Sequence, residues 1–502
     1  MISYPKNLLG HIRQFATPEL PVYLVGGAVR DQMMGLESRD LDFVVKEEAI
    51  SLGRRVADAT GGAFYVLDAE RGIARVLVNI DDENLTLDFA NFRGDNLEGD
   101  LCQRDFTSNA LALDLGVPER IIDPLNGRRD IESKIIRACS IASFKDDPVR
   151  ILRAVRFSFQ LGFTIDSATE RELRSSVPLL ANSTIERQRD ELFYILGGPK
   201  PCLAITILEN YDILPNLLPE LVPLVHFPQS SHHAHDVWDH TLAVLDYCEQ
   251  ILDSFLQHSK KEIGNSYLKS ASEKLQPFHS KLKKYFDEPM NPLRSFRSIF
   301  MFAALYHDVG KPATRTEDEK GIHFFDHEFL GAEMTRDRAR TLALSNEEVQ
   351  FIKNVIHNHM RIHPLVKTEN LDFRKAAYHY FLTAGKSGVA DCLFSLADLL
   401  STYEEHMEAT RWEAGTKMCI SLLDAWFNHY PEFIKPLLLI NGDELQSQFH
   451  LKPGPLIGSL LAKLEEAQAV GKVKSLGEAQ KFIQSILSGT QEEEDGRGEI
   501  IL

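Results

Sequence analysis

The order of strand-type and helix-type patterns along the chain limits its fold more than any other feature. Short apolar runs that suit strands are confined to roughly the first 130 residues, and from about residue 140 apolar residues recur every three or four positions. We expect strands over 21–25, 41–45, 63–67, 73–80 and 85–89, and a helix over 28–34 that Gly35 ends. Helical spacing continues over 149–163 and 185–196. The chain is therefore predicted to have an α+β head followed by helical domains.

The length and the proline distribution predict four parts. A chain of 502 residues is too long for one ordinary domain, and several prolines between 201 and 228 mark a boundary in its helical portion. We divide it into a head (1–138), a helical neck (139–225), a helical domain (226–410) and a helical tail (411–502). Residues 256–295, polar and rich in Lys and Ser, predict a helical insertion. The acidic end, GTQEEEDGRGE, predicts a frayed, disordered terminus.

Charge and cysteine usage exclude several classes of protein. The net charge of −18 excludes a polycation that coats nucleic acid, so any RNA contact needs a local basic surface. Residues 128–156 offer one, with eight basic and four acidic side chains. The six cysteines include no C-x-x-C pair, which suits reduced thiols. Neither a signal peptide nor a membrane-spanning run is recognisable, so we expect a cytoplasmic protein.

A glycine pair and an acidic pair stand close together near the N-terminus. Gly26 and Gly27 lie between an expected strand and an expected helix, where backbone amides can approach phosphates. Asp40 and Asp42 share one face of an expected strand, because side chains alternate along a strand. Two neighbouring carboxylates repel each other, and Mg²⁺ would relieve that repulsion. A plain turn and two solvated acids are the alternative interpretation of each pair taken alone.

Four motifs together resemble a known family. GGAVRD followed by DLDF resembles the class II tRNA nucleotidyltransferase/poly(A) polymerase family, and three further motifs follow in that family's order: RDFTSNAL (104–111), DDPVRILRAVRF (146–157) and ERQRDEL (186–192). The resemblance implies a polymerase-β-like nucleotidyltransferase head with a mixed sheet. It also implies Mg²⁺-dependent attack of an RNA 3′-hydroxyl on the α-phosphate, with Asp40 and Asp42 as catalytic metal ligands. The nucleotide-binding residues it implies are Gly26, Gly27, Arg30, Arg104, Asp105, Asp147, Arg150, Arg153 and Arg156.

The third motif also has a physical logic for choosing the base. Asp147, Arg150, Arg153 and Arg156 follow one another at three-residue spacing, so one helix face can present them. A carboxylate accepts hydrogen bonds and a guanidinium donates them, so Asp147 can accept from the amino group of cytosine or adenine while Arg150 donates to the ring. Uracil and guanine present a carbonyl instead. The pair would thus select CTP and ATP, although a salt-bridged surface helix is the alternative.

Histidines and acids in the second half resemble another known ligand set. His240, His307, Asp308 and Asp398 resemble the H…HD…D metal ligands of the HD phosphohydrolase superfamily, and Asp391 competes with Asp398. His327, His357 and His359 match positions that members use for a second metal or for phosphate. The resemblance leaves the metal open among Mn, Ni, Mg and Fe, and structural histidines are the alternative. The tail around Pro453-Gly454-Pro455 resembles the C-terminal module of HD-containing tRNA nucleotidyltransferases, which implies a tRNA contact.

The sequence therefore predicts an enzyme that adds C and/or A residues from CTP and ATP to the 3′ end of tRNA. Fourteen residues (90–103) separate the expected fifth strand from Arg104, and this short segment resembles members that add two cytidines alone. Short forms that complete the whole CCA end are the alternative. Asp88 is either a further acid near the metal or a hydrogen-bonded strand residue. The alternatives are a poly(A) polymerase, an HD phosphohydrolase or phosphodiesterase as main activity, and an inactive RNA-binding protein. No membrane or obligate protein partner is expected.

Overall fold

The computed structural model describes residues 6–80, 83–116, 120–230, 235–256, 265–291, 294–319 and 321–495, with the backbone alone for 6–7 and 489–495. The chain divides into two compact units. The first comprises Met1–Pro199 with Ile207–Leu217, and the second comprises Lys200–Thr206 with Leu218–Leu502. The finer division into head, neck, helical domain and tail stays a prediction.

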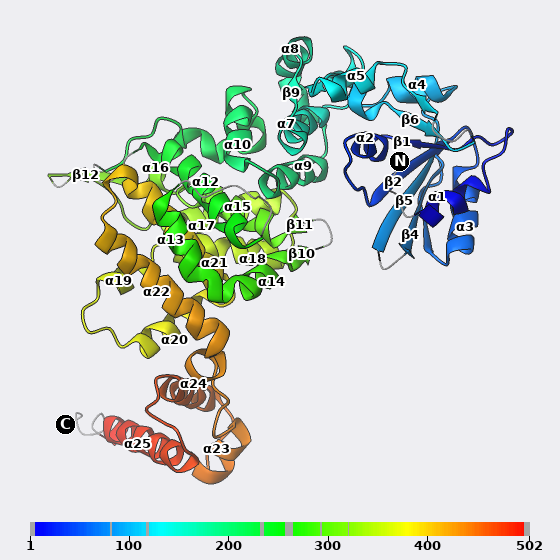
Figure 1. The fold of residues 1–502 in the computed structure, drawn as a ribbon. Helices are drawn as coiled ribbons and strands as arrows, with labels where there is room; N and C mark the ends of the chain where they lie inside the picture. Colours follow the sequence, from blue (N-terminus) through cyan, green and yellow to red (C-terminus); the bar gives the residue numbers. More distant parts are fainter. Residues whose placement is uncertain are drawn as a thin grey trace. The chain divides into compact units, whose positions relative to one another are not determined.

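A mixed sheet lies in the head (Figure 1). It has seven strands in the order β3-β4-β5-β2-β1-β6-β7. β2 and β5 run parallel, and the other neighbouring strands run antiparallel. This sheet, with helices after it, confirms the predicted fold class. The strands are β1 (Tyr23–Val25), β2 (Asp40–Val45), β3 (Ala63–Asp68), β4 (Ile73–Ile80), β5 (Glu83–Asn91), β6 (Ala112–Asp114) and β7 (Ile121–Ile122).

Helices pack around this sheet because apolar residues line one of their faces. α3 (Ala49–Thr60) buries Leu52 and Val56 and contacts β4 and β5. A Cβ atom on Gly53 would lie 3.3 Å from the rings of Phe64 and Phe89, so the helix approaches the sheet closely there. The other helices of the head are α1 (Lys6–Arg13), α2 (Gly27–Met33), α4 (Leu97–Cys102), α5 (Gly127–Glu132) and α6 (Ser143–Asp146).

Three longer helices follow the head within the first unit. α7 (Arg150–Leu161) and α9 (Ile185–Gly197) pack against each other, and α8 (Ser167–Ser176) lies between them in the chain. A parallel pair, β8 (Ile135–Ile136) with β9 (Thr164–Ile165), ties the start of this region to the end of α7. α10 (Pro201–Asn210) runs through the division between the units, and α11 (Leu214–Leu217) follows it.

The second unit is helical, apart from two small hairpins, in the part of the chain that the structure describes. Every residue of α15 (Phe296–Tyr306) is buried, so this helix forms the centre of the unit. The hairpins are β10 (Pro289–Asn291) with β11 (Arg294–Ser295), and β12 (Arg315–Asp318) with β13 (Gly321–Phe324). The remaining larger helices are α12 (Val237–Leu256), α13 (Ser266–Leu275), α14 (His279–Asp287), α16 (Lys311–Thr314), α17 (His327–Thr341), α18 (Asn346–Asn358), α19 (Ile362–Lys367), α20 (Phe373–Ala384), α21 (Ser387–Tyr403) and α22 (Ala409–Asn428).

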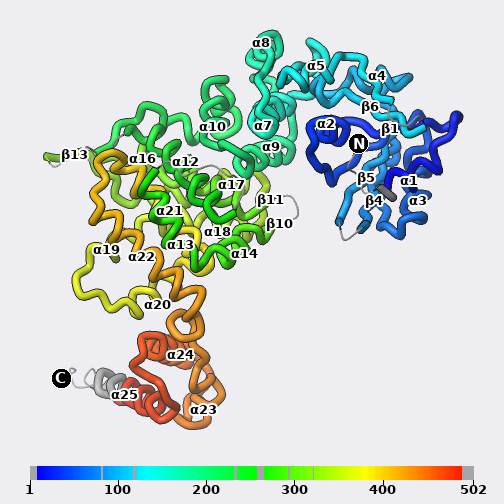
Figure 2. Tube along the Cα trace, in the orientation of Figure 1, coloured from blue at the N-terminus to red at the C-terminus, as the bar shows by residue number. Residues whose placement is uncertain are grey.

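The C-terminal part of the second unit has an apolar core of its own. Figure 2 traces the chain through α23 (Gly442–Phe449), α24 (Pro455–Ala469) and α25 (Leu476–Asp495). Leu460 and Leu464 of α24 form this core with Ala479 and Ile483 of α25. α20 holds the module through polar contacts, in which Arg374 Nε donates to the carbonyl of Ala469 at 2.9 Å.

The expected elements differ from the observed ones chiefly at their ends. β4 has the expected bounds, whereas β5 is longer at both ends and β1 is shorter. The expected insertion contains α13 and α14, but residues 257–264 lie outside the described residues. The helix α25 continues through the acidic stretch to Asp495, where fraying was expected, because Glu and Gln are good helix formers. Residues 496–502 lie outside the described residues. No described helix is long and apolar enough to cross a membrane.

Asp391 of α21 provides a test of the core of the second unit. The residue is 1% exposed, and Arg361 and Tyr380 act on its carboxyl group against the effect of burial. Burial raises the pKa of this carboxyl well above its usual value. The stability that protonated Asp391 gives is complete below the pKa of the unfolded chain, and it is lost as the pH rises through the folded-state value.

We therefore expect Asp391→Asn to gain stability relative to the wild type as the pH rises from 4 to 8. Each unit of pKa shift corresponds to about 1.4 kcal/mol. Urea unfolding of both proteins at several pH values measures this difference. A difference that stays constant with pH would contradict the raised pKa.

Candidate active site

Gly26 forms the turn between β1 and α2. Its φ of 77° lies in the left-handed region, which favours glycine. A Cβ atom here would lie 3.0 Å from Nη1 of Arg104 and 3.5 Å from Oδ2 of Asp42. A Cβ atom on Gly27 would lie 3.5 Å from Nη2 of Arg30. The absence of a side chain at Gly26 thus lets an arginine and an acid from distant parts of the sequence meet at this turn.

Asp40 and Asp42 lie on the exposed face of β2. The intervening Leu41, and Phe43 after the pair, point to the buried face, as strand alternation predicts. The pKa of Asp42 is raised, most of all by desolvation among neighbouring atoms, and the charges of Asp88 and Asp40 add to this, while Arg104 opposes it. An accessible pair of mutually repelling carboxylates suits a divalent cation with a preference for oxygen ligands.

Asp88 lies beside Asp42 in the parallel register of β2 and β5. Its two carboxylate oxygens accept hydrogen bonds from Nε and Nη2 of Arg75 on β4, both at 2.8 Å. The residue is thus a hydrogen-bonded strand acid that also adds negative charge next to the pair. This geometry favours the second of the two interpretations considered for Asp88.

Arg104 is held against the glycine turn by a buried acid. Its Nε and Nη2 donate to Oδ2 of Asp100, at 3.2 and 3.1 Å, and Asp100 is 1% exposed. The third nitrogen, Nη1, is the atom that lies close to Gly26. Arg104 therefore presents positive charge where the sequence predicts that the phosphates of a nucleotide bind.

Asp105 and Arg30 have partners inside the protein. Asp105 accepts hydrogen bonds from Nε and Nη2 of Arg153, at 2.9 and 2.7 Å, and from Nδ2 of Asn109 at 3.0 Å. Burial alone would raise its pKa, but the charge and hydrogen bonds of Arg153 and Asn109 lower it to about 2. Nη1 of Arg30 donates to Oδ1 of the same Asn109 at 2.6 Å. Direct nucleotide contact by these residues stays a prediction, and their observed contacts support the site from within.

Arg153 and Arg156 join α7 to α9 through one buried acid. Glu191 accepts from Nη1 of Arg153 at 3.3 Å and from Nε of Arg156 at 2.6 Å. Both guanidinium groups also lie over the ring of Phe157, at 5.2 and 4.1 Å from its centroid. The two arginines share a helix face, as expected, and fix the orientation of the helix.

Asp147 lies outside that helix, in an extended conformation before α7 begins. Its predicted place on the same helix face as the arginines is wrong, because Pro148 disfavours the helical conformation of the residue before it. Asp147 nevertheless stays near Arg150, with Oδ2 at 3.8 Å from Nε. The sequence reasoning missed Arg187, whose guanidinium binds Asp147, although the quoted motif ERQRDEL contains it.

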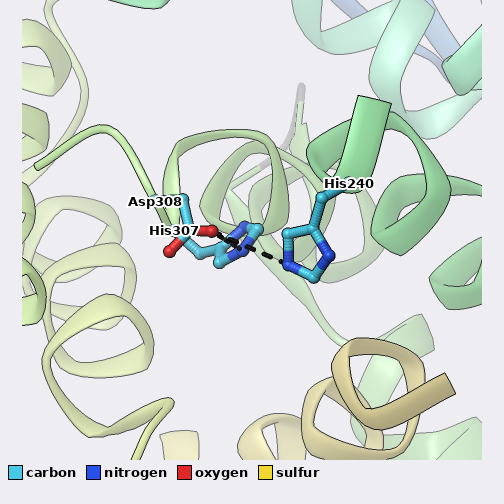
Figure 3. A group of neighbouring side chains, drawn as sticks. All are labelled: His240, His307 and Asp308. Carbon is cyan, nitrogen blue, oxygen red and sulfur yellow. Dashed lines mark ion pairs between the residues drawn. The ribbon is translucent and has the colours of Figure 1, made fainter. Parts of the chain in front are cut away.

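The four residues of the predicted HD ligand set come together in the second unit. His240 Nε2 lies 3.1 Å from Oδ1 of Asp398 and 3.6 Å from Oδ2 of Asp308. His307 Nε2 lies 3.1 Å from Oδ2 of Asp308 (Figure 3). This nitrogen is buried and makes no hydrogen bond in the described structure. A buried imidazole nitrogen without a hydrogen bond, beside two carboxylates, suits a metal ligand.

His240, His307 and Asp308 form one triad of possible metal ligands, and a second triad shares Asp308 with it. Asp308, His327 and His359 offer ligand atoms that lie within 4.8 Å of one another. Burial lowers the pKa of His359 to about 3, and the positive charge of His327 acts in the same direction, so its imidazole is neutral at pH 7. His357 belongs to neither group and packs against the ring of Phe329 instead.

Hydrogen bonds at Nδ1 set the tautomers of His307, His327 and His359. Nδ1 of His307, His327 and His359 lies 2.6–2.8 Å from a backbone carbonyl three residues earlier. A carbonyl can only accept, so each Nδ1 carries the proton. When the ring is neutral, each Nε2 then keeps its lone pair for a cation.

A cavity of about 760 Å³ is lined by Asp308, His327 and His359, and also by Asp398. Lys311, which lies 2.6 Å from Oδ2 of Asp308, and His363, which lies 3.1 Å from Oδ2 of Asp398, also line it. Neither was singled out from sequence, although both follow the histidine motifs closely. Lys367 and Arg411 add positive charge to the lining. Asp391 does not line this cavity, which supports the choice of Asp398.

Three family models match the chain in order. Residues 22–137 match the poly A polymerase head domain. Residues 162–224 match the model described as the probable RNA and SrmB-binding site of polymerase A. Residues 237–403 match the HD domain.

Curated relatives extend the likeness over nearly the full chain. The A-adding tRNA nucleotidyltransferase of Deinococcus radiodurans is 30% identical, over 93% of this chain and 97% of that protein. The CC-adding tRNA nucleotidyltransferase of Thermus thermophilus is 29% identical, over 93% of this chain and 94% of that protein.

Solved structures share the fold. A CCA-adding enzyme in complex with ATP has a TM-score of 0.61 at 20% identity and covers 96% of both chains. The CCA-adding enzyme of Thermotoga maritima in complex with tRNA has a TM-score of 0.56 at 21% identity, and the match covers 96% of this chain and 94% of that one. With its head motifs, HD ligand set and near full-length relatives, this chain belongs to the tRNA nucleotidyltransferase family.

Proposed function

We propose that this enzyme adds C and/or A residues from CTP and ATP to the 3′ end of tRNA. The observation that carries the proposal is the convergence of Asp42 and Arg104 on the turn at Gly26, with α7 fixed beside it through Asp105 and Arg153. Full-length relatives that act on tRNA support it. A cytoplasmic location stays an expectation from the sequence.

The residues of the head divide the chemistry between them. The RNA 3′-hydroxyl oxygen bonds to the α-phosphorus, the bond from that phosphorus to the bridging oxygen breaks, and pyrophosphate leaves. Arg104 presents its charge to the triphosphate, and the Gly26 turn lets the phosphates approach the backbone. The head and HD domains imply divalent-metal use. Asp40 and Asp42 would hold Mg²⁺, which, when bound, lowers the hydroxyl pKa and neutralises the leaving group.

The number of nucleotides added distinguishes the members of this family. The near full-length relatives include an A-adding and a CC-adding enzyme. The segment between β5 and Arg104 contains α4. Its short length resembles that of CC-adding members. Incubation of tRNA that lacks its 3′ end with CTP alone, ATP alone or both separates the three specificities.

We expect Asp40→Asn and Asp42→Asn each to lower nucleotide addition about 100-fold or more, because each removes charge that a cation and a developing transition state require. Asp58→Asn, at an exposed position of α3, is the matched control and should keep full activity. Incorporation of labelled nucleotide measures the effect, and thermal unfolding shows that the fold is kept. Full activity of the Asp42 variant would reject the assigned metal ligands.

Replacement of Asp147 tests the selection of the base. Asp147→Ala removes the acceptor for the amino group, so we expect CTP-over-UTP and ATP-over-GTP preferences to fall by about 10-fold or more, the range that corresponds to one unpaired buried group. Competition between labelled nucleotides measures the ratio. A wild-type preference in the variant would show that another group reads the base.

We also propose a second, hydrolytic activity at the HD site. The two overlapping triads and the basic cavity beside them favour this, because imidazoles and carboxylates together suit a transition metal. A bound divalent metal would supply a Lewis acid for the cleavage of a phosphoester. The four predicted ligands would hold it, with His327 and His359 available for a second ion.

His307→Ala should weaken Mn²⁺ binding about 10-fold or more and abolish hydrolysis of bis(p-nitrophenyl) phosphate, while nucleotide addition stays unchanged. Isothermal titration with Mn²⁺ measures the first effect. His357→Ala, outside both triads, is the control. Unchanged Mn²⁺ affinity in His307→Ala would exclude a metal at this position, and loss of nucleotide addition would make the HD site part of the main reaction.

A further inference from the structure

Arg187 binds the carboxylate that is proposed to read the base. Its Nη1 donates to Oδ1 of Asp147 at 2.9 Å, and its Nη2 donates to Oδ2 at 2.7 Å. The two residues stand 40 positions apart, so the fold and not the local sequence creates this two-point contact. The Arg187 side chain is 53% exposed and that of Asp147 is 23% exposed. The pair therefore lies at an accessible edge of the first unit.

The backbone around Arg187 is fixed by buried neighbours on α9. Gln188 Nε2 donates to the carbonyl of Leu180 at 2.9 Å and to Oγ of Ser183 at 3.0 Å. Glu191, one turn later, receives the two arginines of α7. These contacts set the position from which Arg187 reaches Asp147, although its own side chain is largely open to solvent.

Arg150 is held from its other side. Its Nη2 donates to the carbonyl of Gln103 at 2.8 Å, and its Nη1 donates to Oγ of Ser143 at 2.9 Å and to the carbonyl of Arg104 at 3.2 Å. The remaining nitrogen, Nε, is the one that lies 3.8 Å from Oδ2 of Asp147. A donor and an acceptor thus stand side by side, which is the pattern needed to pair with an amino group and its neighbouring ring nitrogen.

Four hydrogen bonds from Nη1 and Nη2 hold the guanidinium of Arg150. Asp147 precedes the helix and is oriented by Arg187 and by the backbone N–H of Val149. A carboxylate has about four lone-pair positions, and the Arg187 fork occupies one on each oxygen. The backbone N–H of Val149 donates one further hydrogen bond to the carboxylate, and the positions left over face a base. Partial burial would raise the pKa of Asp147, but the hydrogen bonds and charge of Arg187, with the charge of Arg150, lower it. The carboxylate is thus both ionised and held in one plane.

We propose that Arg187 is a positioning residue for base selection, which fixes the plane of the Asp147 carboxylate so that Oδ2 stays beside Nε of Arg150. This inference rests on the proposed function, in which Asp147 accepts from the amino group of the base. Without the two hydrogen bonds from Arg187, the Asp147 carboxylate can rotate away from a base that presents a carbonyl, and water can then donate hydrogen bonds to the carboxylate. Uracil and guanine would then meet a smaller penalty.

The test compares Arg187→Ala and Arg187→Lys with the wild type on one tRNA substrate. Two nucleotides compete in the same reaction, CTP against UTP or ATP against GTP, so a change in tRNA affinity cancels from the ratio. We expect Arg187→Ala to lower the ratio about 10-fold or more, and Arg187→Lys to restore part of it, because an ammonium cannot form the two-point contact. Arg174→Ala is the matched control, since Arg174 is an exposed arginine paired with Glu170 on α8.

A ratio for Arg187→Ala within about twofold of the wild type would overturn the positioning role, as would full restoration by lysine. Asp147→Ala separates this result from failure of the proposed function. If that variant loses discrimination while Arg187→Ala keeps it, the role of Arg187 alone is rejected. If Asp147→Ala itself discriminates like the wild type, the base is read by another group, and the inference fails while the proposed addition of C and/or A stands. Because Arg187 is largely exposed, thermal unfolding of its variants should match the wild type.

Discussion

The partly buried ion pair between Asp105 and Arg153 connects the two halves of the head site. Asp105 follows the arginine that faces the glycine turn, and Arg153 belongs to α7, which begins at Arg150. Breaking one partner of a buried pair is costly because it leaves the other charge without compensation. The pair also shares partners on both sides: Asn109 links it to Arg30, and Glu191 links it to α9. The glycine turn and α7 are therefore held in place by ionic contacts inside the protein.

The two units offer chemically different ligand sets. The head presents aspartates on an accessible strand face, next to arginine. The HD cluster presents buried imidazoles whose tautomers are set by backbone carbonyls, together with two aspartates. Oxygen ligands favour hard cations such as Mg²⁺, and imidazole favours transition metals. The two units thus differ in the kind of cation that their side-chain atoms favour.

The sequence predicts the parts of this structure that local pattern controls. Alternation along β2 and β4 locates both strands, and it also explains why Asp40 and Asp42 share a face. β6 and β7 have three and two residues, too few to produce a recognisable period, so pairing within the sheet determines them. Contacts between residues far apart in the chain could not be predicted from local pattern either. The contacts of Asp147 with Arg187 and of Asp398 with His363 depend on how helices pack. A proline also displaced Asp147 from the helix that spacing alone assigned to it.

The separate core of the C-terminal helices has an evolutionary consequence. Its apolar side chains lie within residues 438–487, and polar contacts from α20 join it to the rest of its unit. Polar contacts at a surface tolerate amino-acid substitutions more readily than a shared apolar interior does, because there a change in volume of one methylene disturbs the packing. The helices α23 to α25 can therefore change in sequence, or be replaced, during evolution without disturbing the packing of the HD domain.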